Sequence, residues 1–187
     1  MAIKVFIDQG HNPSGPNAGA EGNGYREQDL VFTIGMMTAE RLRERGFDVR
    51  VSRETSTTQL GTSNASSLAA RVNDANSWGA DVFISLHANA SDNTSASGQE
   101  AFVYSASSTA LPLAKDILRR LGETTGLRDR GVTARPNLYV LRRTTMPATL
   151  VELGFITNQY DAELMATRPE LFADGVATGV LSYYGML

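Results

Sequence analysis

Short apolar runs alternate with longer segments of helical periodicity from one end of this chain to the other. The runs rich in apolar and β-branched residues, which we expect to be strands, are residues 3–7, 47–51, 82–86, 101–104, 138–141 and 149–151. Between them, apolar residues at helical spacing predict helices that begin near residues 27, 68, 111 and 159. This order of elements predicts an α/β layer architecture and argues against an all-β sandwich or a helix bundle.

The strand expected at residues 82–86 is apolar throughout except for one serine, which is typical of a strand buried on both faces of a parallel sheet. Several connecting segments are expected to be loops. Residues 10–24 are rich in Gly, Pro and Asn, and residues 54–67 are rich in Ser, Thr and Asn, with serines that can cap the next helix. The basic, glycine-containing stretch before residue 138 is also expected to be a loop, and Pro169 is expected to break the C-terminal helical segment.

The composition fits one compact domain covering residues 1–187. A chain of 187 residues with 42% hydrophobic content can bury a continuous core without disulfides, and the absence of cysteine excludes a thiolate metal site. The net charge of −3, from 17 Lys and Arg against 20 Asp and Glu, gives no electrostatic basis for binding nucleic acid or an anionic membrane. The sequence starts with an apolar strand and shows no signal peptide or long hydrophobic stretch, so no membrane insertion is expected.

The two histidines of the sequence each follow an expected core strand. His11 comes soon after the first strand, and His87 directly follows the strand at residues 82–86. Glu152 is placed in the same way after residues 149–151. Because ligands bind beyond the carboxyl ends of the strands in parallel α/β sheets, we expect these three side chains to converge on one edge. Glu152 is also followed by Leu-Gly-Phe, and a carboxylate among residues that favour burial needs a partner or a catalytic role.

Two imidazoles and a carboxylate at a sheet edge match the catalytic zinc pattern, in which three N and O ligands leave a fourth position for water. Glu27, at the start of the first helix, is the preferred third ligand, and Glu21 in the glycine-rich loop is the alternative. By spacing alone, the simpler account of Glu27 is an acidic residue stabilised by the helix dipole. Glu152 could likewise form a buried ion pair with Arg142 or Arg143, and a single histidine is more often a surface or core residue than a ligand. The pattern therefore predicts a metallohydrolase without identifying its substrate.

Four motifs occur in order along nearly the whole chain. The first is Asp-x-Gly-His at residues 8–11, and the second is Glu27, which opens the next helix. The third is Arg-x-x-x-Ala-Asn at residues 71–76, leading to Ser-x-His-Ala-Asn at residues 85–89. The fourth is Val-Glu-x-Gly-Phe-x-x-Asn at residues 151–158. Together they resemble the motifs of the zinc-dependent N-acetylmuramoyl-L-alanine amidases found among bacterial cell-wall and spore lytic enzymes.

This resemblance implies a fold and a set of site residues. The fold is a three-layer α/β sandwich whose mostly parallel central sheet is flanked by helices on both faces. Carried over position by position, His11, Glu27 and His87 would bind one zinc ion. Glu152 would be the catalytic acid and base. Asn89 would orient the substrate or hydrogen-bond around the site, and capping of the following loop is an equal alternative for it.

The resemblance also implies a reaction. It is hydrolysis of peptidoglycan at the amide that joins the lactyl group of N-acetylmuramic acid to the L-alanine of the stem peptide. Zinc would lower the pKa of a water molecule and polarise the amide carbonyl, while Glu152 would pass the proton to the leaving nitrogen. Arg71 and Asn76 are expected to pack and hydrogen-bond near the site. The protein is then expected to be extracytoplasmic, associated with the cell wall or spores, with its export signal and any wall-anchoring domain on a longer parent chain.

The sequence departs from many relatives at Asn12 and Pro13, where they carry glycines, and this affects the expected shape of the substrate groove. Some relatives also carry a long helical insertion after the second histidine that blocks the site. Only residues 90–97 separate Asn89 from Gly98 here, so we predict a site that is open without an activator. The alternatives are another zinc peptidase of wall peptides, a glycoside hydrolase with two carboxylates, and a non-catalytic wall-binding module.

Overall fold

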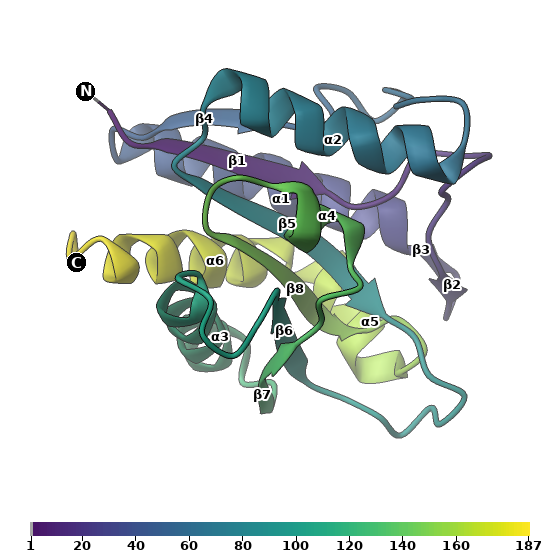
Figure 1. Cartoon of the computed structure of the whole chain (residues 1–187). Coiled ribbons are helices and arrows are strands. Elements are labelled where there is room, and N and C mark those ends of the chain that lie inside the picture. Colours follow the sequence, from purple (N-terminus) through teal and green to yellow (C-terminus); the bar gives the residue numbers. More distant parts are fainter. Residues whose placement is uncertain (1) are drawn as a thin grey trace.

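The computed structural model describes residues 2–187, and a six-stranded sheet forms its centre (Figure 1). In order across the sheet, the strands are β4 (Asp48–Val51), β1 (Lys4–Gln9), β5 (Val82–Asn89), β8 (Ala148–Phe155), β6 (Gln99–Val103) and β7 (Asp129–Ala134). All neighbouring pairs are parallel except β6 and β8, which are antiparallel. The predicted α/β fold with a mostly parallel central sheet is confirmed.

The register of the strands brings the polar residues of the sequence motifs onto one face. Asp8 in β1 pairs with Ser85 in β5, and His87 in β5 pairs with Glu152 in β8. Paired residues on neighbouring strands point to the same side of a sheet, and side chains alternate along each strand. These four side chains therefore lie on one face. Contrary to expectation, β5 and β8 continue past His87 and Glu152, to Asn89 and Phe155. Because β6 runs in the opposite direction, its beginning reaches the carboxyl edge, where Glu100 pairs with Glu152.

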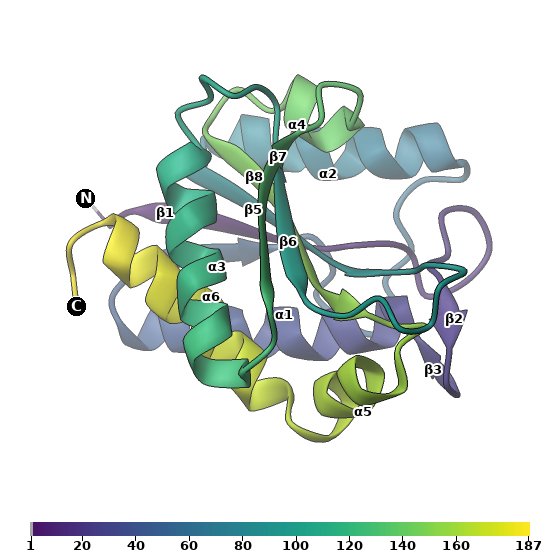
Figure 2. The ribbon, with the colours of Figure 1, turned by 90° about the horizontal axis from the view of Figure 1, so that it is seen from below.

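Helices cover the two faces of the sheet to different extents, as Figures 1 and 2 show. The covered face packs against α1 (Glu27–Glu44), α3 (Leu111–Thr125), α5 (Gln159–Thr167) and α6 (Pro169–Tyr183). The open face packs against α2 (Asn64–Trp78) and the short α4 (Tyr139–Arg143). Helices on both faces confirm the expected three-layer arrangement.

The helices begin and end where the local sequence favours it. α2 starts at a capping box in which Ser63 and Ser66 bond each other's backbone amides, and it ends at Gly79 in the left-handed conformation. The C-terminal segment divides at Pro169, as predicted. α1 buries Ile34 against the sheet and exposes Glu40. Across residues 2–187, no helix has both the length and the apolar character needed to cross a bilayer.

Three segments differ from the sequence-based expectation. Residues 138–141 were expected to form a strand, but residues 139–143 form α4, which buries Val140 and Leu141 on the open face. A run of four apolar residues has no periodicity that separates a strand from one turn of helix. The basic stretch expected to be a loop contains the edge strand β7. The glycine-rich loop contains β2 (Glu21–Gly22), which pairs with β3 (Tyr25–Arg26) directly after the loop.

Candidate active site

Three side chains from distant parts of the sequence meet at the carboxyl edge of the sheet. His11 follows β1, Glu27 is the first residue of α1, and His87 lies in β5. Glu27 Oε1 lies 3.0 Å from His11 Nε2 and 2.9 Å from His87 Nδ1. The two imidazole rings meet edge to face, with 4.8 Å between their centres. The side chains of His11 and His87 are 20% and 19% exposed, so the group lies at a surface that solvent reaches.

The backbone at residues 10 and 11 allows the two rings to approach. A Cβ atom on Gly10 would lie 2.5 Å from His87 Cε1, so a larger residue here would displace the imidazole. His11 has a φ of 67°, in the left-handed region that is costly for residues with a side chain and recurs at functional sites. His11 Nδ1 lies 3.2 Å from the carbonyl oxygen of Asn17. This contact fixes the ring with Nε2 toward Glu27.

The carboxylate of Glu27 is held from both sides by backbone amides. The amide of Ala88 donates to Oε1 at 3.0 Å, and the amide of Ala20 donates to Oε2 at 2.9 Å. Burial by itself raises the pKa of Glu27, but the hydrogen bonds and charges of His11 and His87 outweigh burial and keep that pKa well below its usual range. Glu27 is therefore a fixed, ionised carboxylate beside two imidazoles.

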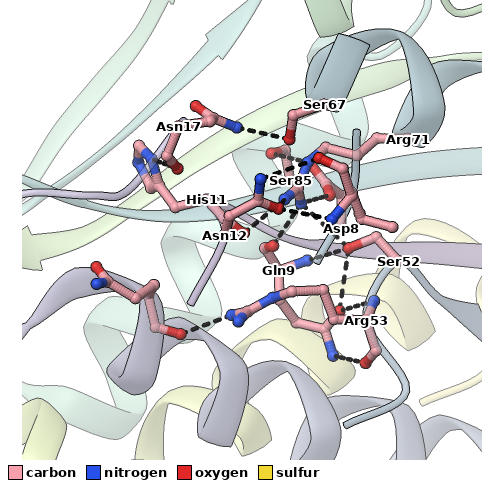
Figure 3. Close-up of polar contacts among 12 residues, drawn as sticks. Asp8, Gln9, His11, Asn12, Asn17, Ser52, Arg53, Ser67, Arg71 and Ser85 are labelled. Carbon is pink, nitrogen blue, oxygen red and sulfur yellow. Dashed lines mark hydrogen bonds and ion pairs between the residues drawn. The ribbon is translucent and has the colours of Figure 1, made fainter. Parts of the chain in front are cut away.

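A buried ion pair supports the backbone of His11 (Figure 3). Arg71 Nη1 donates to Asp8 Oδ1 and to the carbonyl oxygen of Gln9, both at 2.6 Å, and Nη2 donates to the carbonyl oxygen of His11. Ser85 Oγ donates to the second carboxylate oxygen of Asp8 at 2.7 Å. Burial raises the pKa of Asp8, but Arg71 and Ser85 outweigh it and leave the pKa below its ordinary value. Arg71 thus hydrogen-bonds near the site, as expected.

Gln9 and Arg53 connect the end of β1 to the start of α1, and neither was singled out from the sequence. Gln9 Oε1 accepts from the amide of Arg53 at 2.9 Å, and Arg53 Nη2 donates to the carbonyl oxygen of Gln28 at 2.6 Å. The residue after Glu27 is therefore tied to the strand that precedes His11. Figure 3 shows this chain of contacts below the ion pair. The sequence gives no signal for this connection, because the full burial of Gln9 and Arg53 is not visible in it.

Glu152 lies beside this group on the neighbouring strand, cross-strand from His87. Its Oε2 atom is buried and has no hydrogen-bond partner among the described residues. Burial foremost, and then the carboxylates of Glu27 and Glu100, raise the pKa of Glu152 well above its usual range. A carboxyl group whose pKa is raised in this way is suited to general acid and base chemistry. It forms no ion pair with Arg142 or Arg143, both of which are exposed.

Glu100 is a second acidic residue at this edge that sequence analysis missed. It pairs across the antiparallel strands with Glu152, and its Oε1 accepts from Asn89 Nδ2 at 2.7 Å. Asn89 Oδ1 also accepts from the amide of Ala90 at 2.8 Å, so both accounts of Asn89, hydrogen bonding around the site and loop capping, have a contact that supports them. The signal for Glu100 was its place directly before the apolar run that begins at Ala101.

Two further expectations concern Glu21 and Asn76. Glu21 is exposed in β2 and lies outside the candidate metal group, which contains Glu27 instead. Asn76 Nδ2 donates to the carbonyl oxygen of Arg143 at 3.0 Å, at the end of the sheet away from the histidines. Asn76 therefore joins α2 to the end of α4, so it packs and hydrogen-bonds as expected but does not lie near the site.

The donor set of the group fits a zinc ion. One ligand atom each from His11, Glu27 and His87 lies within 4.8 Å of the others. Zinc ligands about 2.1 Å from the ion lie about 3.4 Å apart in a tetrahedron, close to the 3.0 and 2.9 Å found between Glu27 Oε1 and the two ring nitrogens. Magnesium and calcium prefer oxygen ligands, so two imidazoles favour zinc.

Comparison with known proteins shows that this chain is similar to N-acetylmuramoyl-L-alanine amidases. The family model described as N-acetylmuramoyl-L-alanine amidase matches residues 5–182. The N-acetylmuramoyl-L-alanine amidase LytC of Bacillus subtilis is 36% identical over 185 residues, covering 96% of this chain and 35% of LytC. CwlM, the N-acetylmuramoyl-L-alanine amidase of Bacillus licheniformis, is 35% identical over 178 residues, covering 95% of this chain and 65% of CwlM. The chain thus spans about a third of the length of LytC and about two thirds of that of CwlM.

A solved structure agrees with the fold over nearly the whole chain. The crystal structure of an N-acetylmuramoyl-L-alanine amidase from Clostridium difficile 630 superimposes with a TM-score of 0.87 at 33% identity. The match covers 98% of this chain and 97% of that protein. Sequence and fold therefore agree from β1 to α6.

Proposed function

Since the chain belongs to the N-acetylmuramoyl-L-alanine amidase family, we propose that it is a peptidoglycan hydrolase acting on the amide between N-acetylmuramic acid and L-alanine. The observation that carries the proposal is the meeting of His11, Glu27 and His87 at one sheet edge beside the buried carboxyl of Glu152. A wall-binding module has no need of this arrangement. A glycoside hydrolase with two carboxylates would give no reason for the two imidazoles.

His11, Glu27 and His87 would hold one zinc ion in this proposal. When bound, zinc supplies a Lewis acid for the amide carbonyl and makes a water molecule acidic enough to attack at neutral pH. The protein fixes the ligands in advance. Gly10 admits the ring of His87, and the amides of Ala20 and Ala88 hold Glu27.

Glu152 would move the proton that the reaction requires. In its ionised form it accepts a proton from the attacking water, and it then donates that proton to the nitrogen of the leaving L-alanine. Its raised pKa favours retention of the proton between the two transfers. Asn89 would act nearby, in substrate binding, through the contact with Glu100.

We propose that residues 1–187 form a single catalytic domain that works outside the cytoplasm as a secreted protein. The family match over residues 5–182 supports one domain. The sporulation-specific amidase of Bacillus subtilis is 34% identical to the chain, which supports a place at the wall or spore. LytC extends well beyond the matched region, which is consistent with a wall-anchoring domain on a longer parent chain.

Access to the site is proposed to need no activator. Residues 90–98 connect β5 to β6 without a helix, and both histidine side chains are partly exposed. A substrate polymer could therefore approach the metal group directly.

The proposal is tested by incubating the purified chain, loaded with zinc, with isolated peptidoglycan and analysing the products. Free stem peptides with L-alanine at their amino terminus, together with intact glycan strands, are the expected products. Cleavage within the stem peptide would identify another zinc peptidase, and new reducing sugar ends would identify a glycoside hydrolase. Binding to peptidoglycan without any product would identify a wall-binding module.

A further inference from the structure

A cavity of about 190 Å³ adjoins the metal group beneath α2 and α4. His11 and His87 form one side of it, Leu68, Val140 and Leu150 contribute apolar surface, and Arg71 also lines it. Pockets for whole ligands are usually about 300–1,000 Å³. The volume and position therefore suit one small group of a larger substrate whose reacting bond lies at the metal group.

The cavity walls come from three separate elements and are mostly apolar. Leu68 is in α2, Val140 is in α4, and Leu150 is in β8, two residues before Glu152 and on the same face. The charges of Asp8 and Arg71 neutralise each other in the ion pair at 2.6 Å. An occupant that is neutral and partly apolar fits this surface, whereas a carboxylate or an amine has no free countercharge there.

We propose that the cavity is a substrate subsite for a small neutral group whose methyl packs on Leu68, Val140 and Leu150. This inference rests on the proposed function. The proposed substrate offers two such groups next to the reacting amide. One is the N-acetyl group of the muramic acid, and the other is the alanyl unit that follows the cleaved bond.

The test uses three soluble substrates with the zinc-loaded wild-type chain. The parent is N-acetylmuramoyl-L-alanyl-D-isoglutamine, the second carries N-formyl in place of N-acetyl, and the third carries glycine in place of L-alanine. Each analogue lacks one methyl group. Loss of a methyl from an apolar pocket lowers kcat/KM by about 10–200-fold. We expect such a loss for one analogue, and that analogue identifies the group that occupies the cavity.

A variant that fills the cavity checks that the preference arises there. Leu68→Phe adds bulk at the cavity wall and should lower kcat/KM for the parent to the level of the disfavoured analogue. Asn73→Phe is the matched control, because Asn73 is exposed on the same helix and does not line the cavity. It should keep the wild-type preference.

The outcomes separate the subsite from the proposed function. If the wild type hydrolyses all three substrates with equal kcat/KM, or if the preference survives in Leu68→Phe, the subsite is overturned while the amidase function stands. If the wild type hydrolyses neither the parent nor isolated peptidoglycan, the proposed function itself fails. The wild-type comparison does not depend on the folding of any variant.

Discussion

The two faces of the central sheet are built from the same strands but differ in how far their apolar surface extends. On the covered face, apolar residues continue along the strands, from Val5 to Ile7 in β1 and from Ile84 through Leu86 to Ala88 in β5. On the open face, Phe6 is followed by Asp8 and Phe83 by Ser85. The apolar surface of the open face therefore stops short of the carboxyl edge.

As a result, side chains that point to the covered face mainly stabilise the fold, and side chains that point to the open face carry the chemistry. The covered face is packed by α1, α3 and α6 over its length. The open face is packed by α2 and α4 only where Phe6, Phe83 and Leu150 lie, and beyond them it carries the metal group and Glu152. Substitutions in the metal group and at Glu152 should change activity more than folding, and substitutions on the covered face should do the reverse.

The largest effect is expected from Glu27→Ala, which removes one of the three metal ligands. Zinc binding should weaken strongly and hydrolysis of peptidoglycan should be lost, because three protein ligands are needed to hold a catalytic ion. Metal content by atomic emission and product release from peptidoglycan measure the two effects. Glu21→Ala is the control and should retain both zinc and activity. Equal zinc content in the two variants would contradict the assignment of Glu27.

Glu152→Gln is expected to separate catalysis from metal binding. Removal of a general acid and base lowers the rate by about 10²–10⁴-fold, and glutamine has nearly the same shape, so thermal unfolding and zinc content should not change. Glu163→Gln, at an exposed position in α5, should behave as wild type. Loss of zinc from Glu152→Gln would show that Glu152 is a ligand rather than the base.

Asp8→Asn tests the polar support beneath the open face. It leaves the buried Arg71 guanidinium without its ion pair, which should lower the free energy of unfolding by about 3–5 kcal/mol at neutral pH. Urea denaturation measures this loss. A smaller loss, below about 1 kcal/mol, would mean that Arg71 is stabilised by its backbone contacts alone.

The stability that Asp8 contributes to the fold should decrease as the pH falls. In the folded state the pKa of Asp8 lies below its unfolded value of 3.8. Between these two pKa values the unfolded chain binds a proton that the folded chain does not. The stabilisation by Asp8 is present above pH 3.8 and is lost as the pH falls through the folded pKa. Unfolding free energies at pH 7 and pH 3 should therefore differ less in Asp8→Asn than in the wild type.

The smallest effect is expected on the covered face, where α3 and α6 pack closely. A Cβ atom on Gly179 would lie 2.5 Å from Ile117 Cα, so Gly179→Ala should destabilise the fold by about 1–3 kcal/mol despite the higher helix propensity of alanine. Gly122→Ala is the control, because the nearest atom to its Cβ would be Leu127 O at 3.7 Å. It should stabilise by up to about 1 kcal/mol. Activity per folded molecule should stay at the wild-type level in both variants.

The sequence was sufficient to predict the strands that carry the site. The runs before His11, His87 and Glu152 are apolar enough to be buried, and parallel strands place their carboxyl ends together. The meeting of the two imidazoles with a carboxylate follows from this topology. The choice of Glu27 over Glu21 could not be made from spacing, because it depends on how the glycine-rich loop folds back onto α1.

Other features depend on tertiary contacts that the sequence does not show. Residues 138–141 carry strand-forming residues, but packing of Val140 and Leu141 under α2 favours a helical turn. Glu100 was missed because its strand runs antiparallel, so that its start rather than its end reaches the catalytic edge. The support of Gln28 by Arg53 likewise joins residues 25 positions apart.

The reversed direction of β6 has an evolutionary consequence. Because β5 ends and β6 begins at the same edge of the sheet, the segment at residues 90–98 joins them beside the metal group. Loops of this kind tolerate changes in length that strands do not. A longer or shorter segment would change which molecules can reach the metal group without changing the residues that form it. Access to the site and the residues of the site can therefore evolve independently.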